Sequence, residues 1–70
     1  MTPGVRARAL RRACEILGGE APLSRYLRVS ALSVAVWIAG AEPPPTDVFL
    51  KAVDVIVDRE LDELRRSHEE

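Results

Sequence analysis

The segment that decides the fold is PLSRYLRVSALSVAVWIAG, residues 22–40. It carries two short apolar patterns separated by a few residues. Leu23 and Leu27 lie four residues apart, so on a helix they face the same side. Val34 and Trp37 then share one face of a following helix. Two short helices joined by so tight a turn predict a helix-turn-helix unit, in which the first helix braces the second at a steep angle.

Residues at the ends of these helices support this interpretation. Ser30 predicts where the second helix begins, because its hydroxyl can accept a hydrogen bond from an unpaired amide in the first turn. The helix then runs to about Ala39, and Gly40 ends it. The small Ser24 falls where the two helices cross most closely, and a larger side chain there would force them apart.

A longer helix is expected before this unit. It should start near Thr2 and Pro3, since proline is favoured at the first helical position, and end at the pair Gly18–Gly19. A short second helix follows, at about residues 20–27. The apolar positions of the first helix recur at intervals of three and four residues: Val5, Ala9, Leu10, Ala13, Ile16 and Leu17.

After the unit, the consecutive prolines Pro43–Pro45 predict a stiff connector to a last helix at about residues 45–67. Opposite charges four residues apart support that helix, at Asp47–Lys51, Arg59–Glu63 and Asp62–Arg66. The sequence therefore predicts an all-α protein, a compact helix-turn-helix bundle of four to five helices with a long C-terminal helix. Residues 1–70 are expected to form a single domain, with its helix-turn-helix unit at about residues 20–40.

The last helix is apolar nearly all round in its first half, so it is expected to bury more than one face. A second copy of the chain is the simplest partner for the extra face, because a chain of 70 residues builds only a thin core. The alternative is that the distal leucines belong to a frayed, charged tail. The residues expected near a homodimer interface on this helix are Phe49, Val53, Ile56, Val57, Leu61 and Leu64.

The composition argues against an enzyme. Cys14 is the single cysteine and His68 the single histidine, so neither an intrachain disulfide nor a metal cluster is expected. The sequence contains no nucleophile–base pair or phosphate-binding loop, and no cofactor is expected. The lone thiol and the lack of a signal peptide favour a cytoplasmic setting. No membrane span is expected, because the apolar run 31–41 is about half the roughly 20 residues that a membrane helix needs.

The net charge of −1 conceals an asymmetry. Residues 1–40 carry six arginines against two glutamates, a charge of +4, and residues 41–70 carry four basic side chains against nine acidic ones, a charge of −5. A basic front can meet a polyanion such as DNA. The same distribution also fits two ordinary solvated faces, and composition alone favours neither.

The chain resembles the Cro and lambda-repressor-like helix-turn-helix superfamily, especially short Cro-type and antitoxin-like regulators of bacteria and prophages. The family pattern has a small residue, a leucine, a glycine, a branched apolar residue and a serine, followed by valine, tryptophan and glycine. The resemblance covers roughly residues 9–57. The matching positions are Ser24, Leu27, Arg28, Val29, Ser30, Val34, Trp37 and Gly40.

Three positions depart from this pattern. Arg28 replaces the turn glycine, at a cost of about 1 kcal/mol if the position still needs a positive φ. Glu20 stands where a glutamine usually touches the DNA backbone, and a carboxylate repels phosphate. The groove-facing positions of the recognition helix are apolar, whereas direct readout of bases normally uses Arg, Lys, Asn or Gln. These positions are Ala31, Leu32, Ala35, Val36 and Ala39.

The resemblance implies a homodimeric protein that binds double-stranded DNA, as a small transcriptional regulator. The alternative is a protein-interaction module on the same scaffold, whose apolar third helix docks a protein partner. The arginines of the first helix fit phosphate contacts and a solvated surface equally well. The residues expected at the DNA are Arg8, Arg11, Arg12, Arg25, Arg28, Ser30, Leu32, Ser33 and Val36.

Overall fold

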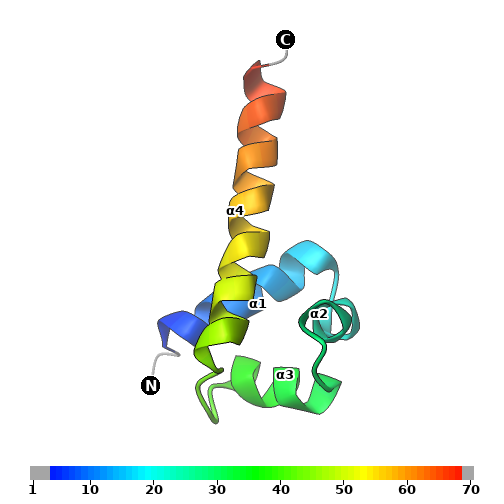
Figure 1. The fold of residues 1–70 in the computed structure, drawn as a ribbon, viewed down its shortest axis with the longest axis vertical. Coiled ribbons are helices and arrows are strands. Elements are labelled where there is room, and N and C mark those ends of the chain that lie inside the picture. The colour runs from blue at the N-terminus through cyan, green and yellow to red at the C-terminus, as the bar shows by residue number, and fades with distance from the viewer. Residues whose placement is uncertain (1–3, 69–70) are drawn as a thin grey trace.

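The computed structural model describes residues 4–68 and has four helices, with no strand in that range (Figure 1). They are α1 (Val5–Leu17), α2 (Glu20–Leu27), α3 (Ala31–Ala39) and α4 (Thr46–His68). The expected all-α architecture with a long last helix is confirmed. The start predicted for the first helix, near Thr2 and Pro3, lies outside the described residues, and within them the helix begins at Val5 after Gly4. No helix of residues 4–68 has the length and apolar character needed to cross a membrane.

Every helix contributes to one small core. Leu10, Leu23 and Val34 are fully buried, one each from α1, α2 and α3, and α4 adds Val48 and Ala52. Leu27 belongs to the same cluster, and Trp37 packs against it half-buried, as the two patterns in the helix-turn-helix segment predict. The most extensive contact between elements joins α1 to α4, so the first and last helices close the bundle.

The face of α1 that meets the core differs at one end from the predicted stripe. Val5 is 63% exposed, whereas Ala7 is only 5% exposed. The apolar spacing alone does not show that Val5, the first residue of the helix, is more exposed than Ala7. Ala7 lies one turn before Leu10 and Ala13, which are both buried.

The connector between α3 and α4 is held to the start of α1. Pro44 is fully buried, and its carbonyl oxygen accepts a hydrogen bond of 3.1 Å from Nη1 of Arg6. The same guanidinium lies 5.5 Å from the centre of the Phe49 ring, a cation–π arrangement. Arg6 therefore ties together α1, the proline connector and the first turn of α4.

α4 extends well beyond the bundle (Figure 1). Its last buried side chain is Val55, and every side chain from residue 57 to residue 67 is exposed. We call residues 57–67 the overhang. At about 1.5 Å per residue, a helix of 23 residues is roughly 35 Å long, so α4 sets the 44 Å long axis of a molecule only 26 Å by 18 Å across.

Candidate nucleic-acid interface

The turn between α2 and α3 is tight and contains a strained arginine. Arg28 has φ 60° and ψ 43°, the left-handed conformation, and it is the one non-glycine residue with a positive φ among residues 4–68. The amide of Val29 donates a 3.0 Å hydrogen bond to the carbonyl of Ser24, which closes the end of α2. The positive φ suspected for Arg28 from the sequence is thus confirmed, and its side chain is exposed directly before α3.

Ser24 is a buried polar residue of α2. The residue is 8% exposed, and its hydroxyl donates a 2.8 Å hydrogen bond to the carbonyl of Ala21, one turn earlier in α2. A polar side chain can be buried here because the hydroxyl has this local partner. The small serine is therefore buried, which is consistent with its predicted place between the two helices.

The N-terminus of α3 carries both polar side chains of that helix region. Ser30 accepts a 3.1 Å hydrogen bond from the amide of Ser33, the predicted helix cap. Its hydroxyl also donates to the hydroxyl of Ser33 at 3.0 Å. Since the hydroxyl of Ser30 takes part in both bonds, the side-chain donor left free at this end of α3 is the hydroxyl of Ser33.

The outer face of α3 is apolar. Leu32 is 75% exposed, Ala39 is exposed, and Ala35 and Val36 are half-buried. None of these side chains can donate or accept a hydrogen bond, although methyl groups can contact the methyl group of thymine. The face predicted to enter the DNA groove is therefore accessible, but any hydrogen bonds to bases must come from its serine end or from neighbouring elements.

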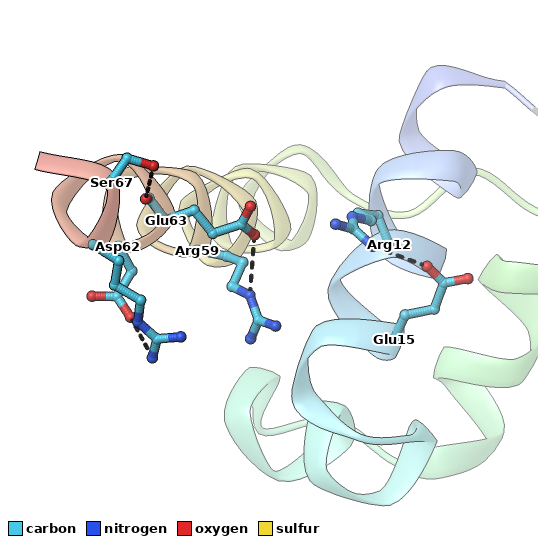
Figure 2. Close-up of polar contacts among 7 residues, drawn as sticks. Arg12, Glu15, Arg59, Asp62, Glu63 and Ser67 are labelled. Carbon is cyan, nitrogen blue, oxygen red and sulfur yellow. Dashed lines mark hydrogen bonds and ion pairs between the residues drawn. The ribbon is translucent and has the colours of Figure 1, made fainter. Parts of the chain in front are cut away.

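The three predicted arginines of α1 have different surroundings. Arg8 is exposed. Nη2 of Arg11 donates a 3.3 Å hydrogen bond to the carbonyl of Ile38, in the last turn of α3, where a cation also complements the helix dipole. Arg12 forms an exposed ion pair of 3.4 Å with Glu15 (Figure 2), which partly neutralises it.

The structure therefore brings cations to both ends of α3. Arg28 precedes its first turn, Arg25 lies exposed on α2 three residues before Arg28, and Arg11 contacts its last turn. Arg8 and Arg12 are one turn apart on the solvent side of α1. Sequence reasoning missed the structural use of Arg6, because its partners at Pro44 and Phe49 lie 38 and more residues away.

The titration of Cys14, the single cysteine of the sequence, is shifted by its surroundings. The pKa of the Cys14 thiol is raised, first by burial and then by the nearby carboxylates of Glu20 and Glu15. A raised pKa keeps the thiol protonated and unreactive near neutral pH. Within residues 4–68, no group of His, Cys, Asp and Glu side chains could hold a metal ion.

The residues predicted at a homodimer interface fall into two groups along α4. Phe49, Val53 and Ile56 are half-buried beside the bundle. Val57, Leu61 and Leu64 are 44%, 50% and 57% exposed, all within the overhang. The second group is thus the accessible one.

No protein-family model, curated protein or solved structure matches this chain. The resemblance to Cro-type regulators, which rests on eight positions of the helix-turn-helix segment, therefore stays a prediction.

Proposed function

We propose that this chain is a helix-turn-helix protein that binds double-stranded DNA as a homodimer and acts as a small transcriptional regulator. The observation that carries the proposal is the placement of cations around an accessible α3. Arg28 and Arg25 are exposed before its first turn, and Arg11 lies against its last turn. Arginines placed at both ends of a helix that enters a groove can contact phosphates on either side of that groove.

The proposed binding depends mainly on charge. α3 offers the DNA a surface of Leu32, Val36 and alanines, with Ser33 as a hydroxyl donor, so phosphate contacts supply most of the affinity. Such binding weakens steeply with salt, because each neutralised phosphate releases counterions. It also discriminates weakly among sequences, because phosphates carry no base identity.

A titration of a DNA duplex at two salt concentrations tests the proposal. Replacing Arg25 and Arg28 together by alanine should weaken binding and reduce the slope of log K against log[salt] by about 3.6 for the homodimer, since each of its four lost phosphate contacts removes roughly 0.9. The double variant Arg59→Ala and Arg66→Ala is the matched control, because it removes the same charge from α4. Equal losses in the two double variants would contradict the assignment of Arg25 and Arg28 to DNA.

A second candidate function is favoured by the exposed apolar face of α3. Leu32 is 75% exposed, and large apolar side chains exposed together often mark a protein interface. In this alternative the helix-turn-helix scaffold presents α3 to a protein partner. An absence of duplex binding even at about 50 mM salt, where charge-driven binding is strong, would make it the leading candidate.

A further inference from the structure

α4 has a second apolar face, on the side opposite to the core. The core side holds the buried Val48, Ala52 and Val55. At 3.6 residues per turn, the members of the second face fall within an arc of about 80°. We call it the α4 outer stripe, and its members are Leu50, Val53, Val57, Leu61 and Leu64.

The outer stripe is accessible except at Val53, which is half-buried. Leu50, Val57, Leu61 and Leu64 are between 44% and 57% exposed, and Figure 1 shows the distal half of α4 standing clear of the other helices. A helix segment as short as the overhang is marginal by itself in water, since most helical stability in proteins comes from packing. A partner along the outer stripe would supply that packing.

The spacing of the stripe in the overhang is that of a two-stranded coiled coil. Val57, Leu61 and Leu64 are separated by four and three residues, which are the intervals between d, a and d positions of a heptad. In the same register Glu60 takes position g and Arg65 position e, one on each flank of the stripe. In parallel coiled coils these positions form ion pairs between helices.

The charges of the overhang are therefore complementary to those of a second copy. Two helices in parallel would place Glu60 of each copy beside Arg65 of the other, which gives two symmetric ion pairs. Figure 2 shows the intrahelical pairs of the overhang, with distances of 3.3 Å for Arg59–Glu63 and 3.7 Å for Asp62–Arg66. In the same register these four residues take positions b, c and f, which lie away from the stripe. They do not compete for Glu60 or Arg65.

We propose that two copies of this chain associate through the α4 outer stripe, with their overhangs parallel as a short coiled coil. The two bundles then lie at the same end of the pair, which suits binding to a single ligand. The inference deepens the homodimer of the proposed function and rests on it, but it needs no DNA. In an antiparallel pair, g positions would face g positions and e positions would face e positions. Glu60 of one copy would then not contact Arg65 of the other.

Charge exchange at these two positions tests the orientation, with dimerisation measured by sedimentation in the absence of DNA. Glu60→Arg and Arg65→Glu should each weaken dimerisation, by roughly tenfold, because each creates two like-charge contacts. The double variant should restore it. If the double variant is as weak as either single variant, the parallel arrangement is wrong.

Cross-linking gives an independent readout in a chain whose own thiol is removed by Cys14→Ser. Leu64→Cys should form a disulfide-linked dimer on mild oxidation, because equivalent d positions meet in a parallel pair. Arg66→Cys is the control, since its side chain is exposed and points away from the stripe. Equal cross-linking of the two variants, or none, would overturn the proposal.

The position of the interface is tested by two lysine substitutions at exposed or half-buried sites. Leu61→Lys should give monomers that keep their helical circular dichroism, whereas Val36→Lys should remain dimeric. Monomers from Val36→Lys alone would assign the interface to α3, and a monomeric unmodified chain would overturn the dimer itself. Loss of DNA binding with dimerisation intact would contradict the proposed function but leave this inference standing.

Discussion

At the scale of single residues, Arg28 is the point where stability and the proposed function conflict. Its left-handed backbone is one that glycine adopts freely and that crowds the Cβ of any larger residue. Arginine at this position places an exposed cation directly before α3. The same residue therefore causes the backbone strain in the turn and supplies the charge for the proposed DNA contact.

Arg28→Gly should therefore stabilise the protein and weaken DNA binding. We expect the free energy of unfolding to rise by about 0.5–1 kcal/mol, since relief of the backbone strain exceeds the entropy that glycine adds to the unfolded chain. Arg25→Gly, inside α2, should instead lower it by about 1 kcal/mol. Urea denaturation of both variants measures these changes, and a less stable Arg28→Gly protein would show that the turn carries no strain.

At the scale of elements, helix ends explain why some boundaries were predicted well. The bounds predicted for α2 and α3 are those observed, because Gly19, Ser30 and Gly40 are strong local signals at the ends. The start of α1 was expected from Thr2 and Pro3, which lie outside the described residues, and Gly4 makes no side-chain cap. Contacts between distant segments were not predicted, because the position of Arg6 against Pro44 depends on how the whole bundle closes.

The candidate site was predictable to a similar degree. The positive φ of Arg28 and the cap at Ser30 follow from local sequence rules, and both are observed. The contact of Arg11 with the last turn of α3 could not be read from the sequence, since it depends on the angle at which α1 crosses α3. The residue types indicated which side chains could contact DNA, whereas the packing of the helices determines which of these side chains lie close together.

The cap of α3 is open to a direct test. Ser30→Ala removes the bond to the amide of Ser33 and should lower the free energy of unfolding by about 1 kcal/mol. Ser67→Ala is a matched control, because that hydroxyl donates to the carbonyl of Glu63 on the exposed overhang. Thermal unfolding of the two variants should differ clearly. Equal effects would mean that α3 is held by tertiary packing alone.

At the scale of the whole molecule, the chain divides into a bundle and the overhang. The core ends at Val55, and side chains beyond residue 56 contribute exposed surface. Folding of the bundle and the proposed association of the overhang should therefore be separable. A substitution in the overhang should alter dimerisation without altering the stability of the bundle.

A chain ending after residue 57 should keep its fold. Its free energy of unfolding should lie within about 1 kcal/mol of that of full-length Leu61→Lys, the monomeric reference, because no buried side chain is lost. It should also be monomeric at all concentrations. Failure of the shortened chain to give a cooperative unfolding transition would show that the overhang supports the core.

The contact between α1 and α4 has a consequence for folding during synthesis on the ribosome. Leu10 and Val55 belong to one core, so the bundle cannot close until the chain has grown some 45 residues beyond Leu10. Translation at roughly 5–20 residues per second makes this a wait of about 2–9 seconds, whereas small helical domains fold within milliseconds. The speed of synthesis, and not the folding step, thus sets how long the core side chains of α1 are exposed in the nascent chain.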